Sequence, residues 1–471
     1  MYQLYYRPKD AWVGDIMPCY HAGEFYMYYQ CDYRKPKGYP DCEPFGWSLS
    51  KSEDMIHFTD YGEVLKKNPA GGREQWLFAG SVIRAYGKFW AFYTARCHAY
   101  FNTEIPAERT CIAVSEDGIN WEKHPEWMLP KPEGYESNLM RDPWVFFEEE
   151  NSRWVLITPQ RKLVGPAVRR GSLTYFTSQD LKHWEFQGDL LDAHMYHLNE
   201  MPDLFRIGEW WYLLYSEYSD ASRTHYRRSR SLMGPWETPP RDWFDSRCLY
   251  AARTLQAGTT RYLFGWNPTR DGNDDLGVWV WGGNTILHEI IVDEQGYLRV
   301  KLPEIYRERF QEAEQGLLCQ KIKLAGLDCR KAEKLAETEN FYRLDLKLSF
   351  IGEGAIFGLR ICVGEDGKGY EYRFSAGESR VCFDKTPGNF WNRLQNRDLY
   401  QSVHLKEGQE YDINLIVDGD VCMLYVDGVA LGARMCEHPG NAVELYVCDG
   451  SVQAEEITLY DKLSVDEAAR S

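Results

Sequence analysis

An internal repeat of aromatic strands runs through the first 310 residues and limits the folds open to this chain. Each copy is a short apolar run entered from a small polar turn, as in residues 21–30 and 86–94. Equivalent aromatic positions follow one another at 64, 65, 57 and 51 residues, a length that fits one propeller blade. These positions are Phe25, Phe89, Trp154, Trp211 and Tyr262.

A second repeated motif follows the strand in three of the copies, at residues 50–58, 115–121 and 178–184. It consists of a serine, an aspartate and then an aromatic residue, which indicates a turn leading into an outer strand. Short strands, frequent turn residues and the lack of long segments with a 3.6-residue period predict an all-β structure. Five such units predict a five-bladed β-propeller over residues 1–304, whose inner strands line one central channel.

The pattern changes towards the carboxyl end of the chain. Residues 321–471 contain segments that alternate apolar and polar positions, such as 342–350 and 421–426, and Asp427-Gly428 is typical of a hairpin turn. These features predict a β-sandwich. Residues 305–320 are charged with spaced apolar positions, which predicts a helical linker between the two domains.

Length and charge narrow the possible functions. A chain of 471 residues suggests two domains. The net charge of −17, without a basic stripe, argues against nucleic acid or an anionic membrane as a partner. No apolar run approaches the ~20 residues of a spanning helix, and the amino terminus lacks the pattern of a signal peptide. We therefore expect a cytoplasmic protein.

The thirteen cysteines indicate reduced, mostly buried thiols. Their number is odd and none forms a Cys-x-x-Cys pair, so neither a disulfide framework nor a zinc site is indicated. No spacing of histidine and acidic residues indicates another metal site, and we expect no metal and no cofactor.

Three acidic residues, Asp15, Asp142 and Glu200, share a local context. Each lies close to a proline and aromatic residues, just before an apolar run, and Glu200 precedes Met201-Pro202, a context that disfavours a helix. Equivalent turns of a repeated architecture would bring the three acids to one pocket, and a pair of close carboxylates is what glycosidic bond cleavage requires. The alternative is three unrelated, solvated turn acids.

These stretches, in this order, resemble the signature segments of glycoside hydrolase family 32, which contains invertases, fructanases and sucrose-6-phosphate hydrolases. Arg141-Asp142-Pro143 matches fully, and Glu200 to Asp203 matches Glu-Cys-Pro-Asp with methionine in place of cysteine. Trp12 to Pro18 matches the first segment imperfectly, because Gly14 stands where the family has asparagine and Ile16-Met17-Pro18 follow the aspartate. The resemblance implies a propeller, a sandwich and a small carbohydrate as substrate.

The resemblance also implies a role for each acid. Asp15 would be the nucleophile that forms a covalent glycosyl-enzyme intermediate, and Glu200 would be the general acid and then the general base. Retention of configuration implies that these two carboxyls lie about 5 to 5.5 Å apart. Asp142 would stabilise the transition state through ring hydroxyls, and Arg141 would orient Asp142 or reach the sugar.

Four further residues occupy positions similar to sugar-contacting residues of the family. They are Gln30, Trp47, Ser81 and Trp12, with Trp12 as a pocket wall. For each tryptophan, burial in a propeller blade is an equally good interpretation.

Three functions follow from these observations. The first is a retaining, exo-acting β-fructofuranosidase-type hydrolase of sucrose or a small fructose-containing oligosaccharide. The second is an inverting furanosidase or arabinanase-like hydrolase of a related five-bladed fold, in which the carboxyls would stand ~6.5 to 9.5 Å apart. The third is a non-catalytic sugar-binding protein.

Overall fold

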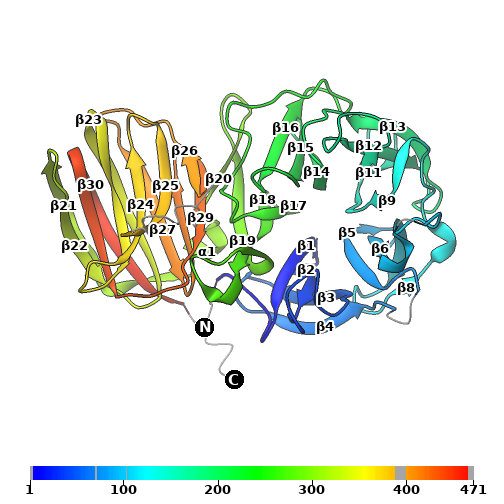
Figure 1. The fold of residues 1–471 in the computed structure, drawn as a ribbon, viewed down its shortest axis with the longest axis horizontal. Helices are drawn as coiled ribbons and strands as arrows, with labels where there is room; N and C mark the ends of the chain where they lie inside the picture. The colour runs from blue at the N-terminus through cyan, green and yellow to red at the C-terminus, as the bar shows by residue number, and fades with distance from the viewer. Residues whose placement is uncertain (1–3, 69–71, 102, 388–398, 465–471) are drawn as a thin grey trace.

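The structure is a computed structural model that describes residues 4–68, 72–101, 103–387 and 399–464. Within these ranges the chain is almost entirely β-structure, with one short α-helix, α1 (Glu304–Arg307). Three short 3-10 helices lie at His98–Tyr100, Pro125–Trp127 and Asp271–Asn273. The strands form two bodies, a ring of sheets and a stack of strands beside it (Figure 1). The all-β prediction is confirmed.

The ring contains strands β1 to β20. One sheet holds β1 (Trp12–His21), β2 (Glu24–Asp32), β3 (Trp47–Ser52), β4 (Thr59–Leu65), β17 (Tyr250–Ala257), β18 (Thr260–Arg270), β19 (Trp279–Val292) and β20 (Leu298–Lys301). The next holds β5 (Trp76–Ala85), β6 (Lys88–Arg96), β7 (Glu108–Ser115) and β8 (Glu122–Lys123). The third holds β9 (Tyr135–Met140), β10 (Trp144–Glu148), β11 (Arg153–Lys162), β12 (Gly171–Ser178) and β13 (Glu185–Leu191). The fourth holds β14 (Asn199–Ile207), β15 (Trp210–Glu217) and β16 (Thr224–Ser229).

The aromatic repeat corresponds to a repeated strand position. Its five markers lie in β2, β6, β11, β15 and β18, and each of these strands is paired antiparallel on both sides. The first and fifth units share one sheet, because β1 pairs with β19 at Val13 and Gly283. Five separate blades therefore stay a prediction.

The motif of serine and aspartate forms the same turn in three units. Ser52 Oγ accepts a hydrogen bond from the backbone NH of Met55. Asp54 Oδ1 accepts hydrogen bonds from the backbone NH groups of Ile56 and His57. Ser115 and Asp117 form the equivalent bonds, as do Ser178 and Asp180. In this motif, side-chain oxygens thus accept the hydrogen bonds of the backbone NH groups in the turn.

The second body contains β21 to β30, with a continuous apolar core drawn from these strands. Its longest strands, β23 (Phe341–Val363) and β30 (Ala442–Leu463), pair with each other. The remaining strands are β21 (Phe310–Gly326), β22 (Lys331–Glu337), β24 (Gly369–Ser375), β25 (Arg380–Thr386), β26 (Tyr400–Ser402), β27 (Tyr411–Asp418), β28 (Val421–Val426) and β29 (Val429–Arg434).

The predicted helical linker over 305–320 is wrong. Only α1 is helical, and β21 already begins at Phe310 and pairs with β30. Pairing with a long neighbouring strand satisfies the backbone of this segment, and tertiary context of this kind overrides helix propensity. The second body therefore takes up its first strand before residue 321.

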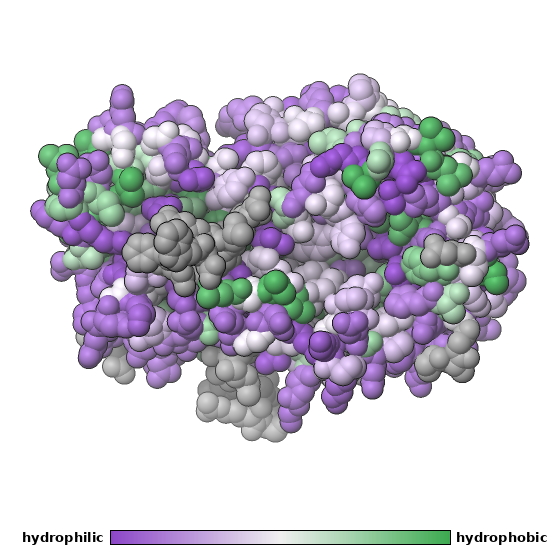
Figure 2. All heavy atoms as spheres, viewed as in Figure 1, coloured by the Kyte–Doolittle hydropathy of each residue, from purple (hydrophilic) through white to green (hydrophobic). Residues whose placement is uncertain are grey.

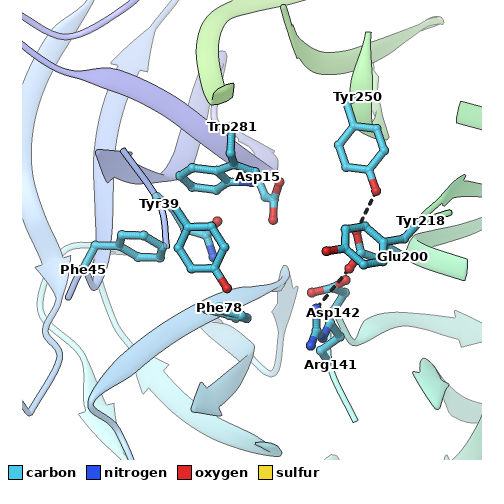
Figure 3. A pocket seen from close by; sticks show the side chains of 11 residues that line it. Asp15, Tyr39, Phe45, Phe78, Arg141, Asp142, Glu200, Tyr218, Tyr250 and Trp281 are labelled. Atoms are coloured by element: carbon cyan, nitrogen blue, oxygen red, sulfur yellow. Dashed lines mark hydrogen bonds and ion pairs between the residues drawn. The ribbon is translucent and has the colours of Figure 1, made fainter. Parts of the chain in front are cut away.

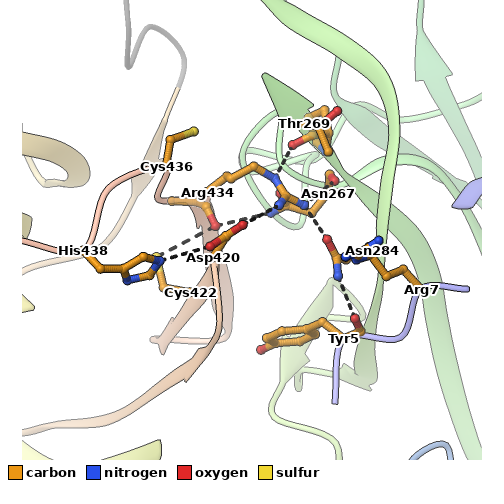
Figure 4. Close-up of polar contacts among 12 residues, drawn as sticks. Tyr5, Arg7, Asn267, Thr269, Asn284, Asp420, Cys422, Arg434, Cys436 and His438 are labelled. Atoms are coloured by element: carbon orange, nitrogen blue, oxygen red, sulfur yellow. Dashed lines mark hydrogen bonds and ion pairs between the residues drawn. The ribbon is translucent and has the colours of Figure 1, made fainter. Parts of the chain in front are cut away.

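Buried polar side chains hold the two bodies together (Figure 4). The Arg434 guanidinium of β29 donates from Nη2 to Asn284 Oδ1 at 2.6 Å and from Nε to the carbonyl oxygen of Pro268 at 2.8 Å. His288 of β19 bonds through Nδ1 to the hydroxyl of Tyr425 in β28 at 2.9 Å. These contacts fix the ring against the second body.

The outer surface is mainly hydrophilic on the face shown in Figure 2, in line with the high content of charged residues. Within the described ranges, no helix has the length and apolar character needed to span a membrane.

Candidate active site

Local irregularities of the inner strands position the three acidic residues. Asp15 lies in β1, where the pairing with β2 shifts between Val13 and Ile16. Glu200 lies in β14, where the pairing with β15 shifts between Glu200 and Asp203. Asp142 lies between β9 and β10 with a φ of 51°. β-Bulges re-aim side chains, which explains how acids from three separate segments reach one place.

The three acids line one cavity in the ring (Figure 3). Gln30 and Arg141 line it as well, so five of the predicted site residues come together. The remaining wall is mostly aromatic and consists of Tyr39, Phe45, Phe78, Tyr218, Tyr250 and Trp281. A cavity with an apolar wall and a few converging polar groups is the usual form of a small-molecule site.

Asp15 is half-buried and accepts a hydrogen bond at Oδ1 from the indole Nε1 of Trp266, at 3.0 Å. The pKa of Asp15 is raised to about 7, mainly by burial; the Trp266 bond opposes this rise and the charge of Glu200 adds to it. The indole therefore holds the Asp15 carboxyl in place and opposes the effect of burial on its pKa.

Glu200 has donors on both oxygens. The Tyr250 hydroxyl donates to Oε2 at 2.7 Å, and Arg141 Nη1 donates to Oε1 at 3.0 Å. Arg141 is itself held by the buried Glu108, with Nε to Oε2 at 3.0 Å and Nη2 to Oε1 at 2.6 Å. Arg141 therefore connects two carboxylates and fixes the direction of Glu200.

Asp142 is held through its backbone and its carboxyl group. Its NH donates to Thr94 Oγ1 at 2.9 Å, and its Oδ2 accepts from the NH of Met201 at 3.2 Å. Burial raises the pKa of Asp142 well above its usual range, and the charge of Glu200 adds to this effect. Because Met201 directly follows Glu200, the bond from its NH holds Asp142 close to Glu200.

Three predicted site residues lie outside this cavity. Trp47 is fully buried and donates from Nε1 to the carbonyl oxygen of Phe78, so it supports the wall instead of forming it. Ser81 is buried in β5. Trp12 lines a different cleft at the junction of the two bodies, where the guanidinium groups of Arg7 and Arg34 contact its ring. Gln30 does reach the cavity, and its Nε2 donates to the carbonyl oxygen of Leu77 at 3.3 Å.

The sequence analysis predicted neither the six aromatic residues that line the cavity nor the partners of the acids. Trp266 and Tyr250 lie opposite each other on the paired strands β18 and β17 of the fifth repeat unit, at positions that the repeat alignment could have singled out. Glu108 carries no local signal, because its partner Arg141 lies 33 residues further along the chain. Among the described residues no cluster of three or more metal-ligating side chains is present.

Known proteins resemble this chain in sequence and fold. The model of the glycosyl hydrolases family 32 N-terminal domain matches residues 5–301. A sucrose-6-phosphate hydrolase of Escherichia coli is 23% identical over 434 residues, covering 86% of this chain and 84% of the relative. One from Zymomonas mobilis is 25% identical, and the match spans 54% of this chain and about half of the relative, 52%.

Two solved structures show the same fold over nearly the whole chain. The exo-inulinase of Aspergillus awamori superposes with a TM-score of 0.77 at 16% identity and covers 98% of both chains. The sucrose-6-phosphate hydrolase of Lactobacillus gasseri superposes with a TM-score of 0.76 at 16% identity, covering 98% of this chain and 93% of that one.

Proposed function

The chain belongs to glycosyl hydrolase family 32, and from this premise we propose that it is a retaining, exo-acting β-fructofuranosidase-type hydrolase. The substrate is sucrose or a small fructose-containing oligosaccharide. The observation that carries the proposal is that Asp15 of β1 and Glu200 of β14 line the same cavity, although 185 positions separate them in the chain. The relatives named above, which are hydrolases of sucrose phosphate and of inulin, support the substrate class.

The first chemical step belongs to Asp15. Its carboxylate attacks the anomeric carbon, a bond forms between Oδ2 and that carbon, and the glycosidic C–O bond breaks. Oδ1 stays bonded to the Trp266 indole, which fixes the carboxylate and favours its charged form. Only the ionised form is nucleophilic.

Glu200 carries out the proton transfers. It protonates the leaving oxygen as the glycosidic bond breaks, and it then takes a proton from the water that releases the sugar from Asp15. The Tyr250 hydroxyl and Arg141 both donate to Glu200, so they stabilise the carboxylate that exists between the two steps.

Asp142 acts on the ring of the sugar. It stabilises the transition state by accepting hydrogen bonds from ring hydroxyls, and these bonds tighten as the ring flattens. Gln30 and Arg141 supply further contacts at the cavity wall. We place this chemistry in a five-bladed propeller over residues 1–304.

Kinetics of two isosteric variants test the proposal. Asp15→Asn and Glu200→Gln are each expected to lower kcat by at least ~10³-fold on sucrose, sucrose phosphate, kestose or inulin, the size of effect seen when a catalytic unit is broken. If the wild type hydrolyses one of these substrates and either variant does so at a near-normal rate, the catalytic roles of Asp15 and Glu200 are rejected. NMR of the first product anomer distinguishes retention from inversion, and inversion would support the second function considered above.

A further inference from the structure

A fully buried arginine, Arg253 of β17, lies behind the turn that carries Asp142. Its Nη2 donates a hydrogen bond to the carbonyl oxygen of Asp142 at 2.8 Å, and its Nη1 donates to the carbonyl oxygen of Pro143 at 3.4 Å. A buried guanidinium is costly in free energy unless hydrogen bonds and opposite charges compensate for it. These two carbonyl groups supply the hydrogen bonds.

A bulge in β17 directs Arg253 to this turn. The pairing of β17 with β18 shifts between Tyr250 and Arg253, and Ala251 has a φ of 54°. In a regular strand, side chains three positions apart point to opposite faces of the sheet. The bulge breaks this alternation, so Tyr250 reaches Glu200 while Arg253 reaches the carbonyl oxygen of Asp142. One irregularity of the fifth repeat unit therefore supports two of the three acids.

The backbone of Asp142 is held from two strands of the ring. Its φ of 51° lies in the left-handed region, which a residue with a Cβ atom adopts only when its surroundings hold it there. Thr94 of β6 accepts a hydrogen bond from the NH of Asp142 at 2.9 Å, and Arg253 of β17 donates to its carbonyl oxygen. These two bonds fix the direction in which the carboxyl of Asp142 enters the cavity.

The charge of Arg253 acts on the same acids. Burial lowers the pKa of Arg253 to about 10, so the guanidinium stays charged at neutral pH. Three carboxyl groups, of Asp142, Asp203 and Asp15, favour this charged form. In return, the positive charge opposes the rise that burial causes in the pKa of Asp15 and of Asp142. Arg253 thus favours the carboxylate forms that the proposed roles of both residues require.

We propose that Arg253 is a positioning residue of the hydrolysis, which holds the backbone of Asp142 so that its carboxylate meets the ring hydroxyls of the sugar. Arg253 lies outside the lining of the cavity, so it acts through Asp142 and through its charge on Asp15. The inference rests on the proposed function, because it assigns a role within that reaction.

Arg253→Met removes both the donors and the charge. We expect kcat at pH 8.5 to fall at least about tenfold with KM within about threefold of the wild type, because the bonds from Asp142 tighten only in the transition state. The acid limb of kcat/KM should also move to higher pH, because loss of the positive charge raises the pKa of Asp15. The other charged and titratable groups that face Asp15 stay in this variant, namely Glu200, Arg141, Asp142 and Tyr250.

Arg253→Lys separates the charge from the hydrogen bonds. Lysine keeps the positive charge, but its ammonium group does not reproduce the planar fork that reaches both carbonyl oxygens. We expect the acid limb of the wild type and a kcat about 3- to 10-fold lower. Urea unfolding gives the folded fraction of each variant, and rates are expressed per folded enzyme. If Arg253→Met does not fold, Arg253→Lys decides, and a wild-type kcat in that variant would overturn the proposal.

Arg261→Met is the matched control. Arg261 belongs to the neighbouring strand β18, donates from Nη1 to Thr254 Oγ1 at 2.7 Å, and acts through its charge on Asp203. Its removal also takes a positive charge from the buried side of the acids. We expect a kcat within about threefold of the wild type and an unmoved acid limb.

The pH profile and the split between kcat and KM decide the outcome. Losses in Arg253→Met that are equal at all pH values, or a rise in KM with unchanged kcat, would overturn the proposal, since they indicate a structural or a binding role. If Arg253→Met has a wild-type kcat and acid limb while Asp15→Asn is inactive, this inference alone fails. Near-normal activity of Asp15→Asn would instead remove the proposed function.

Discussion

The indole Nε1 of Trp266 donates a hydrogen bond to Oδ1 of Asp15 across 3.0 Å. Trp266 belongs to β18 and Asp15 to β1, so the two ends of the ring meet at the proposed nucleophile. This bond opposes the burial that raises the pKa of the carboxyl. The bond therefore connects the strands that close the ring with the charge state of Asp15, on which the proposed attack depends.

The pH dependence of kcat/KM should report the ionisation of the Asp15 carboxyl. The pKa of Asp15 is raised to about 7, so its ionised form is present above that pH and is lost as the pH falls. We expect kcat/KM to fall about tenfold per pH unit below an inflection near 7. A profile that stays flat down to pH 5 would contradict this assignment.

Removal of the indole donor should move this inflection. Trp266→Phe keeps an aromatic ring but loses the hydrogen bond that lowers the pKa of Asp15, so the acid limb should shift to higher pH. Activity then falls more at pH 6 than at pH 8.5. Measured kcat/KM profiles of both proteins check the shift, and equal losses at all pH values would indicate a merely structural role for Trp266.

Tyr250 should affect the proton transfer. Tyr250→Phe removes the hydroxyl that donates to Glu200 Oε2 at 2.7 Å and leaves the ring in place. A charge-assisted hydrogen bond of this kind contributes about 1.5 to 3 kcal/mol, so kcat should fall about 10- to 100-fold. Tyr218→Phe is a matched control on the same cavity, because no hydrogen bond from its hydroxyl to Glu200 is present in the part of the chain that the structure describes. A Tyr250→Phe enzyme with wild-type kcat at every pH would contradict the role.

Arg141 should contribute to stability as well as to catalysis. Arg141→Gln removes one of the two guanidinium partners of Glu108, whose side chain is completely buried. Breaking a buried ion pair in this way typically lowers the free energy of unfolding by about 3 kcal/mol. Urea unfolding followed by fluorescence measures the loss. Arg169→Gln, which breaks an exposed pair with Asp220, is the control and should leave the midpoint unchanged.

Arg434 should hold the two bodies together. Arg434→Met removes the bonds to Asn284 and Pro268 and leaves their buried oxygens without these donors. We expect the free energy of unfolding to fall by about 3 kcal/mol, with kcat/KM of the folded enzyme unchanged. Equal urea midpoints of variant and wild type would show that the interface depends on other contacts.

The sequence predicted the acids of the site better than their surroundings. Asp15, Asp142 and Glu200, whose catalytic roles stay predictions, stand out in the sequence because each combines an acid with a nearby proline before an apolar strand, and that pattern is local. Trp281 and Tyr250 were missed because aromatic residues make up 15% of the chain, so a wall residue is not distinguishable from a core residue by type. For Trp12 and Trp47 the sequence left both interpretations open, and in the structure both lie outside the cavity, since Trp12 lines another cleft and Trp47 is buried.

Long-range pairing explains the errors in the fold prediction. The repeat predicted the ring of antiparallel units, because each unit is built from neighbouring strands. Residues 310–326 were assigned to a helical linker and to the start of the sandwich, because their partner β30 lies more than 100 residues further along the chain. Such pairing is invisible to local periodicity.

The central claim is that Asp15 and Glu200 act on the two sides of one glycosidic bond. Mass spectrometry of Glu200→Ala incubated with an activated aryl fructofuranoside tests it most directly, because loss of the general base slows release of the covalent intermediate. We expect a fructosyl adduct on the peptide that contains Asp15, and no adduct in the Asp15→Asn/Glu200→Ala double variant. An adduct on another residue, or cleavage with inversion and no adduct, would contradict it.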